Sequence, residues 1–411
     1  MIAITGVGAV TPFGGAEETW KALLAGESAL RPASAALRAA GCEVAGPAEG
    51  FDPAQFMDRY HARHMGRFSQ FAVAASRLAV QGAGVDLGDG EGVGLVVHTG
   101  AGGLIEAEAA AAGAATRPHR VSPYFTPTYG PNMAACQPSI ELGVRGPVLG
   151  GVGACAAGIQ AVIDGLRLLQ HGEADIVVAG GTDAALSPLL LGSLANAGAL
   201  APAGPDPAAA CRPFDRSRAG MVASEGAAMF VLEPLDHARR RGAQVLALLA
   251  GGGRSADGYH VTAPHPEGRG TAAALSRAVA DAGLDAADVD VLVAHATATP
   301  RGDEAEAAAV RAVFGEMPQL RVTAPKAALG HGLGAAGAFG VLVAVCCLRD
   351  QLVPPTRNLV DPDPDCGPLD HVRDEPRSGL VRHAIVNAAG FGGQNAAVVL
   401  SAVAEDDGAP G

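Results

Sequence analysis

The sequence predicts an α/β fold made of two similar halves, and three observations support this. Short apolar runs typical of strands alternate with stretches whose apolar residues follow helical spacing. The chain is 49% hydrophobic but only 4% aromatic and holds 57 glycines, a composition that suits closely packed layers. An aspartate-bearing turn followed by a buried strand occurs in both 172–181 and 286–295. This similarity indicates an internal duplication, although any two β/α units share such a pattern.

Each expected element follows from its own pattern. In 159–169, for example, apolar residues recur at helical spacing, whereas 176–179 is a short continuous apolar run bounded by small residues. The alternation of the two kinds of element predicts buried sheets that are predominantly parallel. In chain order, we expect strands at 2–4, 94–97, 176–179, 228–232, 244–250, 289–294, 321–322, 384–387 and 396–401, and helices at 20–24, 68–80, 159–169, 271–282, 303–314 and 337–348.

The division between the halves is expected where a strand runs into Glu233-Pro234. Residues 1–234 would then form one half and residues 235–411 the other. The tail 405–411 is polar and small, so we expect it to fray.

The charge and the apolar pattern narrow the possible classes of function. The formal net charge is −13, and the only basic run is Arg239-Arg240-Arg241, so we expect no nucleic-acid binding. The most apolar stretch, 333–348, is rich in glycine and alanine and too short to span a bilayer, so we expect no membrane association. The N-terminal segment enters a strand pattern at once and lacks the basic region of a signal peptide.

Seven cysteines are present, and no two of them form a C-x-x-C pair. An odd number in a large chain favours reduced thiols in the cytoplasm over a disulfide framework or a zinc site. We therefore expect no metal site.

Cys155 is the strongest candidate for a nucleophile. It lies in the glycine-dense segment Gly150–Gly158, between a strand end at 147–150 and the helical pattern of 159–169. A cysteine at a helix N-terminus faces unpaired N–H groups and the helix dipole, which lower its pKa. The alternative is a small buried hydrophobic residue, the commoner role of a free cysteine.

Partners for Cys155 are expected at three places. His295 ends an apolar strand and is followed by a loop of small residues, where α/β folds place chemistry, although an ordinary loop histidine fits as well. Lys326 and His331 stand in an otherwise apolar segment, which suits a solvated lysine and a capping histidine less well. The segment Gly390–Gly393 offers N–H groups for an oxyanion hole, or is simply a glycine hairpin.

These segments, in this order and spacing, resemble a β-ketoacyl synthase of the thiolase superfamily, in the branch that elongates fatty acids and type II polyketides. The likeness runs from Ile4–Gly14 through 215–233 to Gly390–Gly393. It implies a thiolase-like five-layer αβαβα core made of two duplicated halves, with the nucleophile in the first half and the histidines and lysine in the second. It also implies a dimer and substrates carried on the phosphopantetheine arm of an acyl carrier protein, with no cofactor of its own.

The resemblance also implies roles for individual residues. Cys155 would hold the acyl chain as a thioester. His295 and His331 would bind the carbonyl of the malonyl extender, and Lys326 would orient His331 and add positive charge. The remaining implied residues are Phe391 with Gly390 and Gly392, for the oxyanion hole and gating, and Thr297 with Thr299, for the pantetheine arm.

Some positions depart from the family pattern. Ala296 replaces the usual glycine after the first histidine, and Gly340 replaces a glutamate near the lysine, so Lys326 is expected to lack an ionic partner. Two segments, 137–140 and 322–326, lean toward chain-length factors, the silent partners of ketosynthases. An active condensing ketosynthase, as homodimer or heterodimer, is therefore the main hypothesis, and a chain-length-factor subunit the alternative. A degradative thiolase ranks lower, because no second cysteine lies beside 390–393.

Overall fold

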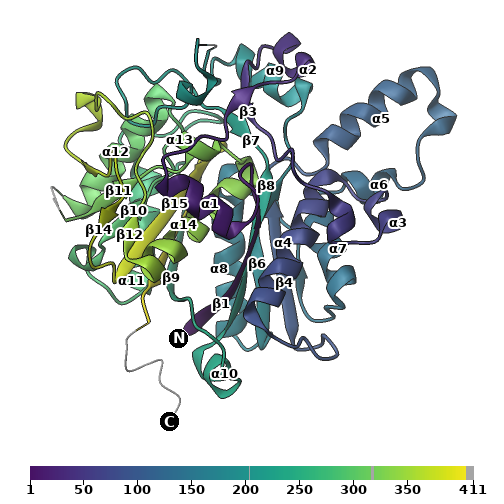
Figure 1. Cartoon of the computed structure of the whole chain (residues 1–411), viewed down its shortest axis with the longest axis horizontal. Helices are drawn as coiled ribbons and strands as arrows, with labels where there is room; N and C mark the ends of the chain where they lie inside the picture. The colour runs from purple at the N-terminus through teal and green to yellow at the C-terminus, as the bar shows by residue number, and fades with distance from the viewer. Residues whose placement is uncertain (203, 316–318, 404–411) are drawn as a thin grey trace.

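The computed structural model of the protein describes residues 1–202, 204–315 and 319–403. Eleven of the described strands form one large mixed sheet in the order β13-β11-β10-β15-β16-β9-β1-β8-β6-β4-β5 (Figure 1), and the others form two small sheets, β12-β14 and β2-β3-β7. The expected fraying of residues 405–411 lies outside the described residues. The strands of the large sheet are β1 (Ile2–Val10), β4 (Val93–Thr99), β5 (Val148–Leu149), β6 (Ile176–Asp183), β8 (Gly226–Pro234), β9 (Ala247–Ala256), β10 (Val291–Val293), β11 (Arg321–Thr323), β13 (Asp370–His371), β15 (His383–Gly390) and β16 (Gln394–Ser401).

The strand pairing repeats in the two parts of the chain. In the first part, β1 pairs antiparallel with β8 and β8 with β6, while β6 pairs parallel with β4 and β4 with β5. In the second part, β9 pairs antiparallel with β16 and β16 with β15, while β15 pairs parallel with β10 and β10 with β11. The two parts meet where β1 pairs with β9. The expected boundary at residue 234 remains a prediction; β8 ends at that residue.

The expectation of predominantly parallel sheets is wrong, because parallel and antiparallel pairs are mixed in both parts. The reason is visible at β15 and β16, which are joined by a tight turn after Gly390 and must therefore run antiparallel. An alternation of apolar runs shows which segments are strands, but it does not show which strands are neighbours.

Helices cover both faces of the sheets and fill the space between them (Figure 1). The central pair is α8 (Ala157–Gln170) and α14 (Ala336–Asp350), which contact each other and strands of both parts. On the outside, α4 (Arg67–Ala83) and α7 (Met133–Leu142) pack on the first part, and α11 (Arg269–Asp281) packs on the second beside α12 (Pro300–Phe314). The layers are therefore helix, sheet, helix, sheet, helix.

Helix α14 is the apolar centre of this arrangement. The stretch Leu333–Asp350 is long and apolar enough to cross a membrane, but 83% of it is buried inside the protein, as in a core helix. The small residues in α14 allow close contact: a Cβ on Gly340 would lie 2.6 Å from a methyl group of Val386 on β15. A glutamate at this position would not fit without a shift, so packing accounts for Gly340.

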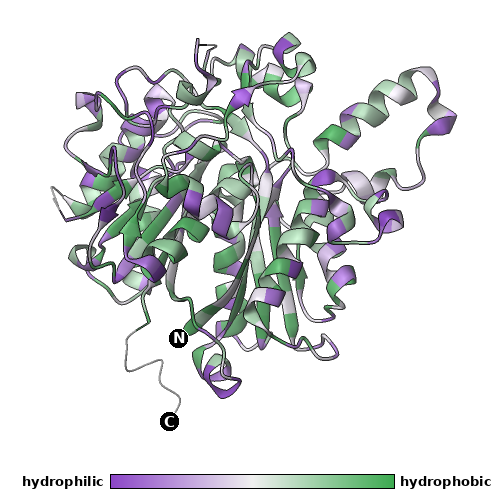
Figure 2. Ribbon diagram, in the orientation of Figure 1, coloured by the Kyte–Doolittle hydropathy of each residue, from purple (hydrophilic) through white to green (hydrophobic). Residues whose placement is uncertain are grey.

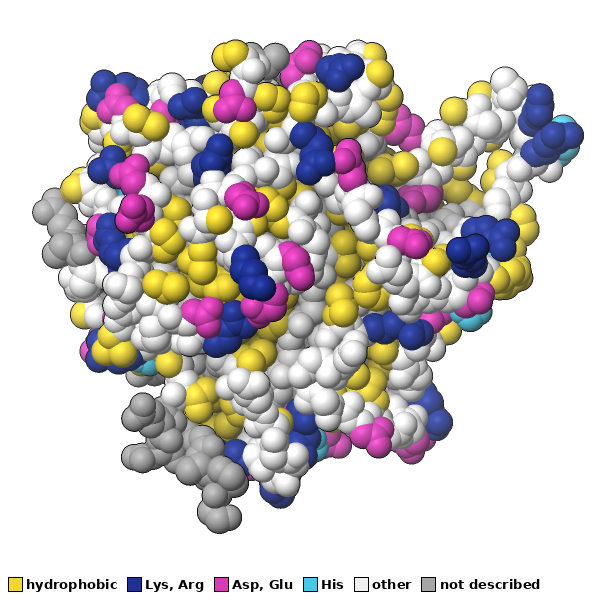
Figure 3. Space-filling model, viewed as in Figure 1, with side chains coloured by type: hydrophobic (Ala, Val, Ile, Leu, Met, Phe, Trp, Pro, Cys, Tyr) yellow, Lys and Arg dark blue, Asp and Glu magenta, His cyan; other side chains and the backbone are white. Residues whose placement is uncertain are grey.

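The expected strands and long helices are present, and Figure 2 shows that the strands are largely hydrophobic. Helix α5 (Leu104–Thr116) was not expected, because its run of alanines has no clear apolar period; it projects from the body as an arm (Figure 1). Helix α7 was missed because it contains Pro138. On the face seen in Figure 3, basic and acidic side chains are interspersed over the main body.

The shorter helices are α1 (Ala16–Leu24), α2 (Ala35–Ala39), α3 (Arg59–Ala62), α6 (Phe125–Tyr129), α9 (Pro188–Asn196), α10 (Leu235–Arg240) and α13 (Lys326–Leu329). The remaining strands are β2 (Arg31–Pro32), β3 (Val44–Gly46), β7 (Ala223–Ser224), β12 (Leu352–Val353) and β14 (Arg377–Ser378).

Candidate active site

Cys155 lies on a turn between β5 and α8, as its sequence context predicts. A short 3₁₀ turn, Ala154–Ala156, precedes the first residue of α8. Ala154 has a φ of +46°, a left-handed conformation that is unusual for alanine. At Gly153, a Cβ would lie 2.9 Å from the Cα of Ala157, so a larger residue would require the backbone of the turn to shift. This tight turn holds the thiol of Cys155, whose residue is only 8% exposed, at the wall of a cavity.

The prediction that Cys155 has a lowered pKa is wrong. Burial raises the pKa of the thiol to about 11; the ammonium of Lys326 opposes this increase, and the carboxylate of Asp183 adds to it. The backbone N–H groups of Phe391 and Cys155 also favour the thiolate, but they do not outweigh burial. The resting residue is therefore a neutral thiol.

A raised pKa predicts how the thiol reacts with pH. Below a pKa of about 11, the thiolate fraction grows about tenfold with each pH unit, so alkylation of Cys155 by iodoacetamide should accelerate steadily from pH 7 to pH 9. The rate can be measured by peptide mass spectrometry, which separates Cys155 from Cys136, a partly exposed cysteine. A plateau below pH 8 would instead show the lowered pKa that a helix N-terminus alone predicts.

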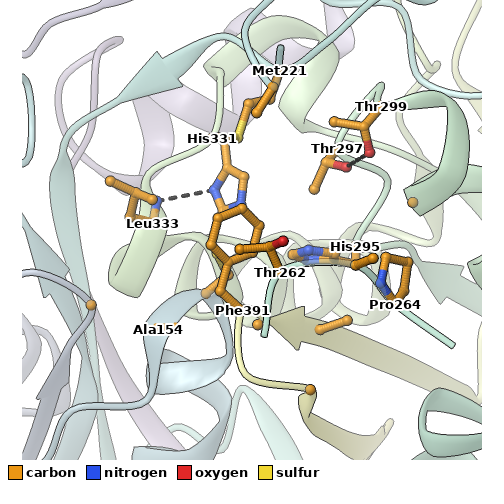
Figure 4. Close-up of a pocket in the computed structure, with 18 of the residues that line it drawn as sticks. Ala154, Met221, Thr262, Pro264, His295, Thr297, Thr299, His331, Leu333 and Phe391 are labelled. Carbon is orange, nitrogen blue, oxygen red and sulfur yellow. Dashed lines mark hydrogen bonds between the residues drawn. The ribbon is translucent and has the colours of Figure 1, made fainter. Parts of the chain in front are cut away.

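His331 follows α13 and is fully enclosed. The backbone N–H of Leu333 donates to its Nδ1 at 3.0 Å, so Nδ1 is an acceptor (Figure 4). Burial and the charge of Lys326 lower the pKa of His331 well below 6.5, which makes the ring neutral. A neutral imidazole that accepts at Nδ1 carries its proton on Nε2. That Nε2 is buried and has no partner in the described part of the chain, so it is an available donor.

His295 comes two residues after β10, and its ring faces that of His331. The two ring centroids are 5.5 Å apart and the rings are nearly perpendicular. Figure 4 shows both imidazoles near Phe391. Burial lowers the pKa of His295 well below 6.5, and the charge of Lys326 lowers it further. Two neutral imidazoles thus converge on one space.

Glu306 on α12 holds the His295 segment in place, and the sequence interpretation missed it. Its carboxylate accepts N–H bonds from His295 and Ala296, each 2.6 Å long, and one from the side chain of Asn387 at 2.8 Å. A signal was present, because Asp303, Glu306 and Phe314 fall on one face of α12 and all are buried. Acidic residues on a buried helix face usually bind something specific.

Lys326 forms no ion pair within the described residues, but the charge of a nearby carboxylate acts on it. Glu306 acts on its buried ammonium and raises its pKa, although burial lowers that pKa more. Glu306 on α12 thus supplies a negative charge near Lys326 without forming an ion pair with it in the described part of the chain. The hydrogen bond that fixes the ring of His331 comes from Leu333 rather than Lys326, whose effect on both histidines is to keep them neutral.

Ala296 has a φ of +36°, so the backbone here is left-handed. Such a conformation costs an L-residue about 1–2 kcal/mol. Glycine would relieve that strain, but it would lose a buried methyl group worth about 0.8 kcal/mol and gain freedom in the unfolded chain. We expect Ala296→Gly to change the free energy of unfolding by less than about 1 kcal/mol, as measured by urea denaturation.

The matched control is Ala307→Gly, at a buried alanine within α12. There the backbone is helical, so glycine adds a propensity cost of about 1 kcal/mol to the lost methyl group. Equal destabilisation by the two variants would contradict the strain at Ala296.

The segment Gly390–Gly393 is a hairpin turn and also forms part of the cavity wall. The sequence offers a glycine hairpin and a cavity segment as alternatives, and the structure combines them. It connects β15 to β16, and Gly390, Phe391 and Gly393 line the cavity. Gly392 does not line it, and its N–H donates to the carbonyl of Val261 at 2.8 Å. That N–H is therefore not free to bind an oxyanion, contrary to the expectation for Gly392. The side chain of Phe391 is 44% exposed and can move without displacing the core.

One cavity of about 320 Å³ brings most of the expected residues together. Cys155, His295, His331, Phe391 and Gly390 line it, and so do Thr297 and Thr299, whose hydroxyl groups are 2.9 Å apart (Figure 4). Its lining is mostly apolar and extends to helix α9. Lys326 is buried and does not line the cavity. The cavity therefore combines a thiol, two neutral imidazole rings and an apolar space.

A group of carboxylates elsewhere has the spacing of a metal site. Oxygen atoms of Glu304, Asp363 and Asp365 lie within 4.8 Å of one another. The guanidinium of Arg218, however, pairs with both Glu304 and Asp363. The group is thus explained as an ion-pair cluster that fastens α12.

Comparison with known families agrees with this geometry. Residues 1–238 match the N-terminal domain of beta-ketoacyl synthases and residues 246–360 match the C-terminal domain. The chain belongs to the β-ketoacyl synthase family. The fold is accordingly the thiolase-like fold of ketosynthases, with the layers described above.

Curated relatives of this ketosynthase-family chain extend over nearly its whole length. It is 37% identical over 405 residues to 3-oxoacyl-[acyl-carrier-protein] synthase 2 of Staphylococcus aureus strain N315, covering 97% of both chains. It is 38% identical over 402 residues to the protein of the same name from Synechocystis sp., covering 96% of both.

Solved structures of ketosynthases are also similar to this chain over nearly its whole length. The ishigamide ketosynthase/chain length factor superposes with a TM-score of 0.91 at 33% identity, covering 98% of this chain and 99% of that one. A type II polyketide ketosynthase in complex with its acyl-carrier protein superposes with a TM-score of 0.90 at 28% identity, with the same coverage.

Proposed function

We propose that the protein is a condensing β-ketoacyl synthase that extends an acyl chain with malonyl units delivered by an acyl carrier protein. The observation that carries the proposal is the convergence of the Cys155 thiol and the rings of His295 and His331 on one apolar cavity. The relatives named as 3-oxoacyl-[acyl-carrier-protein] synthases support it.

The first step transfers the acyl group to Cys155. The sulfur attacks the thioester carbonyl, the bond to the pantetheine sulfur breaks, and the thiol proton passes to that leaving sulfur. Backbone N–H groups of Cys155 and Phe391, which lie close enough to the sulfur to favour its thiolate, would hold the oxyanion. Because the proton leaves with the carrier, no separate stored thiolate is needed.

The second step forms the carbon–carbon bond. The carbonyl oxygen of the malonyl thioester would accept hydrogen bonds from Nε2–H of His331 and from the ring of His295. Loss of CO2 leaves its electron pair in an enolate that these donors stabilise. The enolate carbon attacks the Cys155 thioester, the C–S bond breaks, and the released thiolate takes a proton from water. The reaction so written uses no metal or prosthetic group of the protein.

The supporting roles follow from position. Thr297 and Thr299 stand in the cavity with hydroxyl groups suited to the amides of a pantetheine arm, and Phe391 would move to admit the extender. Glu306 positions His295 through the backbone. We also propose a dimer, as homodimer or with a second subunit, since a ketosynthase/chain length factor is among the similar structures, and a cytoplasmic location that keeps the seven cysteines reduced.

The alternatives have less support. Chain-length factors usually lack the cysteine and the histidines, all of which meet in this cavity. A degradative thiolase needs a second cysteine at the site, but Cys346 and Cys347 are buried in α14, and Cys366 ends a short 3₁₀ turn and does not line the cavity.

The direct test uses the purified protein with acyl- and malonyl-loaded carrier protein. We expect a carrier-bound β-ketoacyl product and, before malonyl carrier is added, an acyl adduct on the peptide that contains Cys155. Absence of both products with carriers from several fatty acid and polyketide systems, alone and with a chain-length-factor subunit, would reject the proposal.

A further inference from the structure

One buried carboxylate near the cavity has no role in the steps above. Asp183 is the last residue of β6, is fully buried, and does not line the cavity. Nothing in its sequence context, the end of a strand of small residues, sets it apart. Its contacts connect the two parts of the chain that carry the nucleophile and His331.

Asp183 accepts four hydrogen bonds, two on each oxygen. Its Oδ1 accepts from the hydroxyl of Thr99 at 3.1 Å and from the N–H of Ala101 at 3.2 Å. Its Oδ2 accepts from the N–H of Gly100 at 2.9 Å and from that of Gly334 at 2.8 Å. The first three donors lie at the end of β4 and directly after it, whereas Gly334 comes three residues after His331. One carboxylate thus joins two walls of the cavity.

The backbone around Asp183 is packed so closely that only glycine fits. A Cβ on Gly334 would lie 2.4 Å from the nitrogen of Gly100, and a Cβ on Gly100 would lie 2.6 Å from the carboxylate. A Cβ on Gly181 would lie 2.4 Å from the carbonyl oxygen of Gly334. Three segments from both halves of the chain therefore converge on this carboxylate.

Asp183 influences His331 indirectly, through Gly334 and its neighbour Leu333. Leu333, next to Gly334, has a φ of +49°, a strained conformation for a leucine. The N–H of the same Leu333 donates to Nδ1 of His331 and sets its tautomer. Fixing Gly334 thus maintains the turn that directs the Nε2–H of His331 into the cavity.

The hydrogen bonds that Asp183 accepts at the end of β4 influence Cys155. The carbonyl of Thr99 accepts the N–H of Gly153 at 3.2 Å, so the end of β4 supports the turn that carries the thiol. The charge of Asp183 also acts on that thiol directly and raises its pKa, against the effect of Lys326. Burial raises the pKa of Asp183 itself to about 6, so its carboxylate is ionised above neutral pH.

We propose that Asp183 is a positioning residue for the condensation, which holds the Cys155 turn and the His331 turn in register by binding Thr99, Gly100, Ala101 and Gly334 together. This inference rests on the proposed function. It deepens that function by naming the group that makes the acyl site and the extender site a single rigid unit.

The test compares Asp183→Asn with the wild type. Because both oxygens accept from two donors, either orientation of an amide places its NH2 group against N–H or O–H donors. We expect the condensation rate per folded site to fall by about 100-fold, as for a misplacement of about 1 Å. Alkylation of Cys155 at pH 7.5 should become severalfold faster, because the charge that raises its pKa is gone.

The second variant, Thr99→Val, removes one donor to Asp183 while keeping the charge and the volume; it also removes the acceptor of the Gly102 N–H, which lies 3.0 Å from the hydroxyl. We expect a smaller, severalfold loss of condensation without faster alkylation. The control is Glu233→Gln, at a buried carboxylate on β8 that binds Thr5 and Arg241 away from the cavity. It should leave the condensation rate per folded site unchanged.

Several results would overturn the proposal. Condensation by Thr99→Val and Asp183→Asn at the wild-type rate would overturn it. A loss of condensation rate in Glu233→Gln as large as that in Asp183→Asn would also overturn it. If Asp183→Asn does not fold, Thr99→Val decides the matter: wild-type turnover rejects the role. If the wild type itself does not condense, the proposed function fails; the alkylation rates then decide whether the charge of Asp183 acts on Cys155.

Discussion

Replacing Cys155 by alanine is expected to lower the rate of condensation at least about 10³-fold, because no other group in the cavity can form the acyl thioester. The change removes one sulfur atom at a cavity wall, so the protein should stay folded. The measurement is carrier-bound product formed per minute, together with the intact mass of the protein after incubation with acyl carrier protein. The wild type should gain the mass of one acyl group, and the variant should gain none.

Cys136→Ala is the matched control, because Cys136 is a free cysteine outside the cavity. It should acylate and condense as the wild type does. If Cys155→Ala condenses at the wild-type rate in the presence of a ketosynthase partner, the chain is a subunit of the chain-length-factor type. The experiment therefore separates the two functions that the sequence leaves open.

The elements of the fold could be predicted, but the neighbours in the sheet could not. The apolar spacing that predicts a helix at 159–169 is a local property, and α8 follows it closely. The pairing of β8 with both β1 and β6 depends on residues far apart in the chain, about which local periodicity says nothing. The arm α5 escaped prediction because an alanine-rich helix that projects from the body has no apolar face to bury.

The candidate site also has features that the sequence predicts and features that it does not. Residues marked by unusual chemistry in a small-residue setting, such as Cys155 and His331, could be found from the sequence and do line one cavity. Their electrostatic environment could not be predicted from the sequence, because the pKa of Cys155 depends on how deeply the fold buries the thiol and on the charges of Asp183 and Lys326. Glu306 and Asp183 act through backbone N–H groups, which leave no trace in side-chain spacing.

Replacing His331 by alanine is expected to separate the two half-reactions. Nε2–H of His331 is one of the donors available to the enolate, and removal of such a donor typically costs about 10²–10³ in rate. Malonyl decarboxylation and condensation should therefore fall by that factor. Acylation of Cys155 should change little, because its oxyanion is assigned to backbone N–H groups.

The control for this variant is His371→Leu. His371 is also buried, with a pKa lowered to about 4 and neither ring nitrogen bonded within the described part of the chain, but it packs on Phe214 outside the cavity. It should keep both half-reactions. The neutral state of His331 adds a pH criterion. Because the pKa of His331 lies well below 6.5, the wild-type decarboxylation rate should stay level from pH 8 to pH 7, and it should fall below pH 7 as Asp183, whose pKa is about 6, becomes protonated. A rate that rises as the pH is lowered through 6.5 would mean that a protonated imidazole does the work, and the tautomer set by Leu333 would then not be the reactive form.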